Sequence, residues 1–190
     1  MPANPKTTRS EIVEAARALV ERHGRDGFSM QDLAAAVGIR APSLYGRFEN
    51  RDQLVEAVEL HVCAELAALL ERAAIKDDPE ASLMAQSKAA RRFAKRNPNG
   101  FSMLFDIRSV HTAEGTSARA AALAPLIPSF AALVGEDRAH AAARVLTPFL
   151  IGFISMELAK AFRLGGGLDA NFEAGVRTIL CGLALWRTTA

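Results

Sequence analysis

The chain has 190 residues, a 50% apolar composition and a formal net charge of +2. This length allows one large domain or two small ones with a substantial core, and high hydrophobicity with low net charge excludes a disordered chain. The N-terminus lacks the apolar segment of a signal peptide, and no uninterrupted apolar run reaches the roughly 18 residues of a membrane span. We therefore expect a globular, cytoplasmic protein with no membrane partner.

The chain contains many alanine and leucine residues and no alternation typical of strands, which predicts an all-α fold. Thr8 opens the first helix with the pattern of a capping box. Ser29 caps a short second helix, which ends at Gly38, the residue type best suited to a left-handed turn. The third helix lies within "VGIRAPSLYGRF", residues 37–48.

Further helical segments follow, and capping residues or prolines mark their ends. They run from residue 51, after Asn50, to about 75, from 79 to about 96, from 98 onward, from 117 to 134 as one kinked helix or two short pieces broken at Pro125 and Pro128, from about 137 to 164, and from a cap at Asp169 to about 188. The sequence therefore predicts about nine helices.

The second and third helices have the pattern of a helix-turn-helix. Gly38 joins them, and the small Ala34 lets them approach closely. Burial of Ile39, Leu44 and Phe48 would anchor the third helix. It would leave four polar side chains facing outward: Arg40, Ser43, Tyr45 and Arg47.

These outward-facing residues have the chemistry of DNA contacts. Arginine pairs with phosphate or guanine, and serine and tyrosine hydroxyls reach phosphate oxygens. Gly46 costs about 1 kcal/mol in a helix interior, yet it leaves room for a backbone such as that of DNA. Residues 1–51 contain eight Lys/Arg and six Asp/Glu, so the whole positive excess lies there. The alternative is a solvated helical hairpin at the surface of a bundle.

Three motifs follow one another near the N-terminus: "GFSMQDLAAAVGI", "SLYGRF" and "NRDQL". With their flanking residues they resemble the three-helix DNA-binding domain, and the start of the fourth helix, of the TetR family of transcriptional regulators. The resemblance implies a DNA-binding domain over residues 1–52 and an effector-binding and dimerisation domain over residues 53–190.

The resemblance also implies which residues contact DNA. Ser43, Tyr45 and Arg47 would do so from the third helix, while Ser29 and Gln31 would meet backbone phosphate. Arg51 stands where the family usually has lysine, and Pro42 stands where glycine is common. The full candidate set is Ser29, Gln31, Arg40, Ala41, Ser43, Tyr45, Arg47 and Arg51.

The last two predicted helices have faces suited to dimerisation. Small residues on one and a broad apolar stripe on the other predict a four-helix interface between two copies, although burial within the monomer is the alternative. Residues 149–176 loosely resemble a C-terminal TetR subgroup with a tryptophan-histidine-glycine signature, of which only Gly152 matches. The candidate interface residues are Gly152, Ser155, Ala159, Phe172, Val176, Ile179, Leu183 and Trp186.

Aromatic and methionine side chains gather in the middle of the chain. Most will form core, but a subset would suit an apolar ligand pocket with a few polar groups. The candidate lining residues are Phe93, Phe101, Met103, Phe105, Phe130, Phe149, Phe153 and Met156, with Asp106, Arg108 and His111 as the nearest polar groups.

Other chemistry has little support in the sequence. Cys63 and Cys181 lie far apart in apolar helical patterns, which predicts buried, reduced thiols. The histidines are scattered singly, so we expect no metal site, no cofactor and no enzymatic activity. The sequence thus predicts a homodimeric repressor that an apolar small molecule releases from a palindromic operator. The alternative is a helical ligand-binding or scaffold protein that does not bind DNA specifically.

Overall fold

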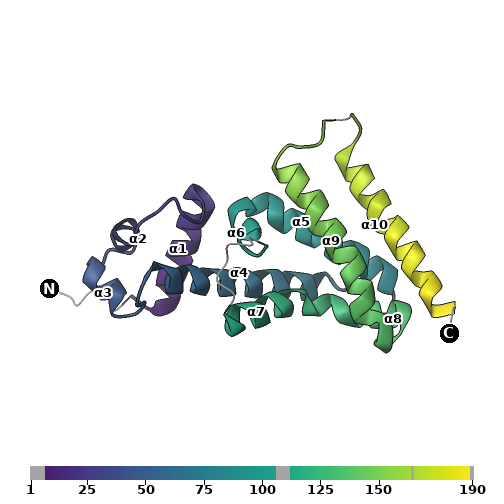
Figure 1. Cartoon of the computed structure of the whole chain (residues 1–190), viewed down its shortest axis with the longest axis horizontal. Helices are drawn as coiled ribbons and strands as arrows, with labels where there is room; N and C mark the ends of the chain where they lie inside the picture. Colours follow the sequence, from purple (N-terminus) through teal and green to yellow (C-terminus); the bar gives the residue numbers. More distant parts are fainter. Residues whose placement is uncertain (1–6, 106–111, 164, 189–190) are drawn as a thin grey trace. The chain divides into compact units, whose positions relative to one another are not determined.

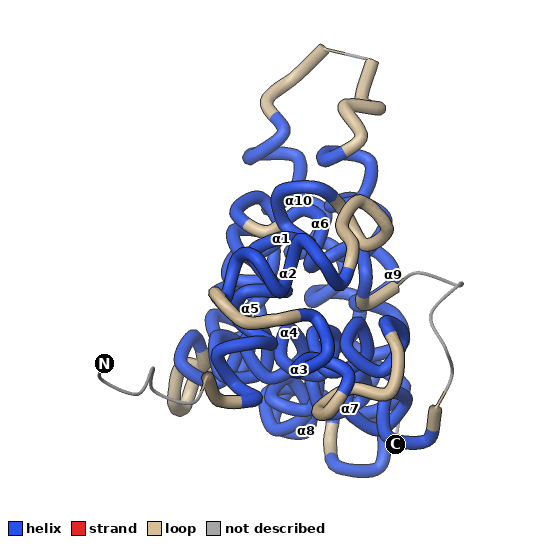
Figure 2. The backbone as a smooth tube through the Cα atoms, turned by 90° about the vertical axis from the view of Figure 1, so that its left-hand side faces the viewer, coloured by secondary structure: helices blue, strands red, loops and turns tan. Residues whose placement is uncertain are grey.

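The computed structural model describes residues 7–105, 112–163 and 165–188, and every regular element in these ranges is helical (Figures 1 and 2). The prediction of an all-α fold is confirmed. The α-helices are α1 (Arg9–His23), α2 (Met30–Val37), α3 (Ala41–Tyr45), α4 (Arg51–Ala73), α5 (Pro79–Arg96), α6 (Pro98–Met103), α7 (Ala113–Leu123), α8 (Ile127–Val134), α9 (Ala139–Leu158) and α10 (Leu168–Ala184), with 3-10 turns η1 (Ala124–Leu126), η2 (Glu136–Arg138) and η3 (Leu185–Thr188).

Three of the predicted helix starts, those of α1, α2 and α4, have the capping bonds that the sequence indicates. The Thr8 hydroxyl accepts from the backbone of Glu11 at 3.2 Å, and the Glu11 carboxylate accepts from the backbone of Thr8 at 2.6 Å. Ser29 and Asp32 form the same reciprocal pair at 3.1 and 2.8 Å. The Asn50 side chain accepts from the backbone of α4 at 2.9 Å. Each cap satisfies N–H groups that a helix start leaves unpaired.

The chain packs as two compact units. The first contains residues 1–64 and 97–119, and the second contains residues 65–96 and 120–190. Helix α6, which we expected in the effector-binding domain, packs against α1 within the first unit. These units describe packing, so the functional division after residue 52 stays a prediction.

Each unit has its own apolar core. In the first, Ile12 of α1, Leu33 of α2 and Leu44 of α3 have no exposed surface. In the second, α5, α8, α9 and α10 pack together, and Phe130 and Phe172 are fully buried. The periodic apolar faces of these helices explain the two cores.

The two C-terminal helices begin and end differently from the prediction. Helix α9 stops at Leu158 instead of continuing to residue 164, and Lys160 has a positive φ of 52°. Gly167 is the N-cap of α10, so Asp169 lies inside its first turn. The Asp169 carboxylate does not cap the helix but forms an ion pair with Arg91 at 2.7 Å. Asp169 follows Leu168, the first residue of the helix, so it lies beyond the position from which a side chain caps.

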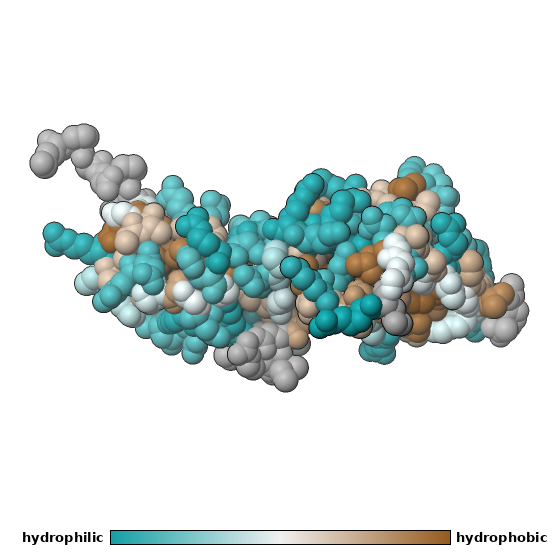
Figure 3. Space-filling model, turned by 90° about the horizontal axis from the view of Figure 1, so that it is seen from above, coloured by the Kyte–Doolittle hydropathy of each residue, from teal (hydrophilic) through white to brown (hydrophobic). Residues whose placement is uncertain are grey.

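Two stretches are more apolar than expected. Residues Ala113–Val134 and Glu136–Leu158 are long and apolar enough, by length and composition, to cross a membrane. The first consists of α7, η1 and α8 in series, and the second consists of η2 and α9. Core helices of soluble proteins pass the same test. Much of their surface is not buried within one chain. Figure 3 shows one face of the molecule, with hydrophobic patches between hydrophilic side chains.

Candidate DNA-binding surface and effector region

The turn between α2 and α3 depends on Gly38. This residue adopts φ 70° and ψ 29°, the left-handed conformation that glycine reaches without strain. The backbone N–H of Ile39 donates to the carbonyl of Ala34 at 3.0 Å, which closes the end of α2. The turn therefore has the form of a glycine helix cap and fixes the direction in which α3 leaves it.

Helix α3 is held by its apolar side and exposes its polar side. Leu44 and Phe48 are fully buried, whereas Tyr45 is 54% exposed. Arg40 and Ser43 are exposed as well, and Ala41 is half-buried. The expected outward face of α3 is thus present on a packed support. That DNA binds to this face is a functional proposal.

Arg47 has a structural contact in addition to its predicted role. Its side chain is half-buried, and its guanidinium donates to the backbone carbonyl of Thr7, just before α1. A guanidinium has several N–H donors, so this bond leaves donors for a phosphate. Arg47 can therefore hold the start of α1 and contact DNA at once.

Arg51 is held more firmly than a free phosphate-binding side chain. It donates to the carbonyls of Phe28, at 3.3 Å, and Arg25. It lies 3.6 Å from the Asp26 carboxylate and 5.1 Å from the centre of the Phe28 ring. These contacts tie the start of α4 to the segment between α1 and α2, a role that the sequence did not indicate.

The two residues expected at the start of α2 differ in availability. The Ser29 hydroxyl donates to the Asp32 carboxylate at 2.7 Å, and this bond lowers the pKa of Asp32. The hydroxyl proton of Ser29 is therefore already donated to Asp32 and is not available to a phosphate. Gln31 is exposed, and its amide has no hydrogen-bond partner among the described residues. Gln31 is thus the better placed of the two for a phosphate.

A polar junction that the sequence did not reveal joins α1 to α6. The Glu21 carboxylate accepts from the backbone N–H groups of Asn99 and Gly100, both at 3.0 Å. The Asn99 side chain returns a bond to the Glu21 carbonyl at 2.9 Å. A Cβ added at Gly100 would lie 3.2 Å from the carboxylate. The close fit connects the helix-turn-helix to residues far along the chain, and no local sequence pattern signals such a pair.

The eight candidate residues, of which a subset was expected to line an effector pocket, belong to both units. In the first unit, the rings of Phe101 and Phe105 are 5.1 Å apart. In the second, Phe149 and Phe153 pack against Phe172 at 6.3 and 5.2 Å. The remaining members are Met103, buried in the first unit, Phe93 and Phe130, buried in the second, and Met156, which is 46% exposed. Asp106, Arg108 and His111 lie outside the described residues.

Gln86 is a polar residue in the core of the second unit that sequence reasoning missed. It is fully buried on α5, and its amide nitrogen donates to the carbonyls of Leu70 at 3.2 Å and Pro125 at 2.9 Å. These two bonds fix the orientation of the amide. Its oxygen has no hydrogen-bond partner among the described residues. A buried carbonyl without a donor costs about 1–3 kcal/mol.

The dimer prediction needs a correction on α10. Phe172, Val176 and Leu183 are buried in the core of the second unit and so cannot form the surface of an interface. Ile179 and Trp186 are half-buried, while Gly152, Ser155 and Ala159 of α9 are exposed as expected. The exposed face of α10 instead contains Ala174, Thr178, Cys181 and Gly182, followed by Leu185 of η3, and that of α9 adds Val145, Pro148 and Met156.

The two cysteines have different environments. Cys63 is buried, and burial together with the nearby Glu59 carboxylate raises its pKa to about 11, so it stays an unreactive thiol. Cys181 is exposed on α10, and the expectation that it is buried is wrong. Its apolar neighbours in sequence belong to the opposite, buried face of the same helix.

Comparison with known proteins agrees with this architecture. Residues 12–58 match the model of bacterial regulatory proteins of the tetR family, and residues 83–179 match that of the tetracyclin repressor-like C-terminal domain. An uncharacterized HTH-type transcriptional regulator of Mycobacterium tuberculosis is 28% identical over 156 residues, which cover 80% of this chain and 71% of that protein.

Solved structures share the fold over nearly the whole chain. A protein of unknown function from Rhodococcus sp. RHA1 gives a TM-score of 0.79 at 22% identity and covers 97% of this chain and 99% of its own. A TetR from Streptomyces coelicolor gives 0.76 at 18% identity, with 95% and 99% covered. A TetR variant from Acinetobacter baumannii in complex with minocycline gives 0.68 at 21%, with 96% and 99% covered.

A helix-turn-helix with an exposed polar helix, followed by a helical C-terminal region, defines a class of transcriptional regulators that bind DNA through their N-terminal helices. The chain belongs to the TetR family. It is accordingly a transcriptional regulator with an N-terminal DNA-binding domain and a C-terminal ligand-binding domain.

Proposed function

We propose that this regulator binds a palindromic operator as a homodimer and represses transcription until a small, mainly apolar molecule releases it. The observation that supports the proposal most directly is the polar face of α3 on its buried support. Arg40, Ser43 and Tyr45 are exposed there, while Leu44 is fully buried. A regulator of this kind acts where the DNA is, so we expect it in the cytoplasm.

The DNA contacts divide by chemistry. The Arg40 side chain has no hydrogen bond or ion pair among the described residues, so its guanidinium is available to a base edge or a phosphate. Ser43 and Tyr45 offer exposed hydroxyls from the same short helix. Arg47 and Gln31 would position the protein through phosphate groups. Together they would set α3 in a major groove.

A palindromic operator requires two reading helices related by symmetry. Half-sites lie about 34 Å apart or at a multiple of this distance along the DNA, so a dimer must present two copies of α3. The exposed small and apolar residues of α9 and α10 suit a four-helix interface. Gly152 on α9 and Gly182 on α10 would let helices approach closely across it.

The effector would bind inside the second unit next to Gln86. The unpaired oxygen of this amide would accept a hydrogen bond from an O–H or N–H group of the ligand. Buried apolar side chains such as Phe93 and Phe130 would supply the remaining contacts. The ligand would therefore be an apolar molecule with at least one donor.

Release from DNA would require the effector to favour a different arrangement of the reading helices. The bonds from Glu21 to Asn99 and Gly100 give one route, because they join α1 to α6 directly. A shift of α6 would change the position of α1 and the helix-turn-helix with it. The effector must bind the released arrangement more tightly, since otherwise it changes no population.

Selection of bound sequences from random duplex DNA tests the DNA-binding proposal. We expect a palindromic motif, and we expect salt-sensitive binding to it. Ser43→Ala should change base preference or affinity while leaving the fold intact. Ser102→Ala, at an exposed serine of α6, is the matched control and should change neither. A protein that binds no duplex at low salt would instead be a helical ligand-binding protein or scaffold.

The selected motif also leads to the effector. Genes next to matching sites would indicate which compounds to test, and their affinity should fall in Gln86→Leu, which removes the acceptor. Coupling is then measured directly, as the affinity for operator DNA with and without the compound. If both bind together with unchanged affinities, the release mechanism is wrong even though DNA binding stands.

A further inference from the structure

A groove of about 430 Å³ lies on the second unit, along one side of α5 and against the start of α10. Its volume is within the range of small-molecule sites. The wall on the α5 side is basic. Its lining residues are Lys88, Arg91, Arg92, Lys95 and Arg96 from α5, and Asp169, Phe172 and Glu173 from α10.

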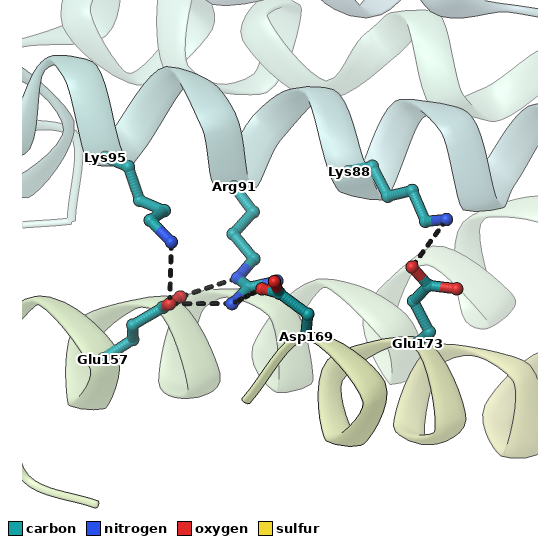
Figure 4. Close-up of polar contacts among 6 residues, drawn as sticks. All are labelled: Lys88, Arg91, Lys95, Glu157, Asp169 and Glu173. Carbon is teal, nitrogen blue, oxygen red and sulfur yellow. Dashed lines mark hydrogen bonds and ion pairs between the residues drawn. The ribbon is translucent and has the colours of Figure 1, made fainter. Parts of the chain in front are cut away.

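Three of the five cations have carboxylate partners (Figure 4). Lys88 pairs with Glu173 at 2.8 Å, and Lys95 pairs with Glu157 at 3.2 Å. Arg91 donates to both oxygens of Glu157 at 2.6 and 2.7 Å. Counting Glu157, the groove thus has five positive and three negative groups, which leaves an excess of positive charge.

The excess belongs to Arg92 and Arg96. Both side chains are exposed, and neither has a hydrogen bond or an ion pair among the described residues. They lie four residues apart on α5 and therefore on the same side of the helix, in one row with Lys88. Two unpaired guanidinium groups at this spacing can bind one anion together.

Arg91 shows where such an anion would enter. Its side chain is only 10% exposed and lies over the buried Phe172 ring at 4.8 Å, which fixes its position. The Asp169 carboxylate that contacts it at 2.7 Å is 84% exposed. A carboxylate reaching from solvent to a buried guanidinium marks a path that an outside anion could also take. Asp169 thus occupies the place of a ligand's charged group.

We propose that this groove is a second ligand site, which binds a small organic dianion with phosphate or carboxylate groups. One charged group replaces Asp169 at Arg91, and the other binds Arg92 and Arg96. The site differs from the apolar effector region around Gln86, and it does not depend on that proposal. Its occupation would free Asp169 and the first turn of α10, a helix of the proposed dimer interface.

A small ligand fits the groove better than a nucleic acid does. Three carboxylates lie among the cations, and they would repel a phosphate backbone that runs along α5. A small dianion can bind Arg92 and Arg96 while staying away from Glu173. Guanidinium groups also match the planar geometry of carboxylate and phosphate oxygens.

Calorimetric titration of the full chain tests the proposal. The probes are phosphoserine, which has a phosphate and a carboxylate, and succinate, which has two carboxylates, and each is compared with a counterpart of zero net charge, serine and succinamide. We expect saturable binding of at least one dianion and none of the neutral compounds. The dianion that binds more tightly identifies the charged group. Absence of saturable binding by both dianions, or equal binding of a neutral counterpart, would overturn the proposal.

Charge variants locate the site. Arg92→Ala/Arg96→Ala should weaken binding about tenfold or more, the loss expected for charge-assisted hydrogen bonds. Asp169→Asn should strengthen it severalfold, because the competing charge is removed. Arg72→Ala/Arg144→Ala removes the same charge at exposed positions outside the groove and should have no effect.

Three results would overturn the assignment to this groove. They are unchanged affinity in the Arg92/Arg96 variant, an equal loss in the Arg72/Arg144 control, and displacement of the dianion from the groove by a short random-sequence duplex. The last would make α5 a nucleic-acid surface. Circular dichroism of each variant confirms that the fold is retained, as expected for exposed side chains.

Discussion

Gly38 and Gly46 lie close together in the helix-turn-helix but have different reasons to be glycine. Gly38 has a φ of 70°, whereas Gly46 has a φ of −73° that any residue adopts. A Cβ at Gly46 would meet only the Ser43 carbonyl, at an ordinary 3.7 Å. Of these two glycines, the fold therefore requires only Gly38. The reason for glycine at residue 46 would be the close approach of DNA.

We expect Gly38→Ala to lower the free energy of unfolding by about 1 kcal/mol or slightly more, the cost of a left-handed alanine. Gly46→Ala, the matched control, should leave stability unchanged or slightly raised. Urea denaturation of both variants measures the difference. Equal stability of the two variants would contradict the role given to the turn. Operator affinity should fall in Gly46→Ala if the DNA backbone approaches there.

Arg47→Ala should weaken operator binding and reduce its salt dependence, because one phosphate partner is lost. The slope of log affinity against log salt concentration should decrease by about 0.9. Arg47→Lys retains the charge and should keep most of that slope, even though it loses the planar contact to Thr7. Anisotropy titrations over a range of salt concentrations would show this. An unchanged slope in the alanine variant would remove Arg47 from the phosphate contacts.

At the scale of helices, local sequence was sufficient to predict where a helix begins when the capping bond lies within a single helical turn. The caps at Thr8, Ser29 and Asn50 were predictable, because each bond joins residues within three positions of one another. Asp169 was not, because its partner Arg91 lies on another helix. The ion pair joins residues of two helices, and the sequence contains no record of the distance between them.

The Arg91–Glu157 pair connects α5 to α9 and should make stability depend on pH. Hydrogen bonds from Arg91 hold the pKa of Glu157 below its ordinary 4.5. A carboxylate with a lowered folded-state pKa stabilises the fold above its ordinary pKa, and this contribution is lost as pH falls through the folded value. We expect Glu157→Gln to be less stable at pH 7 and to lose less further stability below pH 4.5.

Urea midpoints at neutral and acid pH measure that difference between Glu157→Gln and wild type. Glu136→Gln, at an exposed carboxylate of η2, is the control and should follow the wild-type profile. Parallel acid profiles for Glu157→Gln and wild type would show that this pair does not link stability to pH.

At the scale of the whole molecule, the exposed faces of α9 and α10 should control assembly. We expect Met156→Arg to shift the protein from dimer to monomer, since it places a charge in the proposed interface. Ile75→Arg is a close control, because Ile75 and Met156 are each 46% exposed. Light scattering during gel filtration measures both. If Met156→Arg remains a dimer to the same extent as Ile75→Arg, the interface lies elsewhere.

The sequence by itself determined the helical class, the helix-turn-helix and the family, because these follow from periodicity and from caps and motifs within a few residues. Only the tertiary structure decided which face of α10 is buried. It also decided that the amide oxygen of Gln86 has no hydrogen-bond donor among the described residues, and that Arg91 pairs with Asp169. Helix periodicity shows that an apolar stripe exists. It cannot show which neighbour covers the stripe, because contacts between helices depend on the packing of residues far apart in the chain.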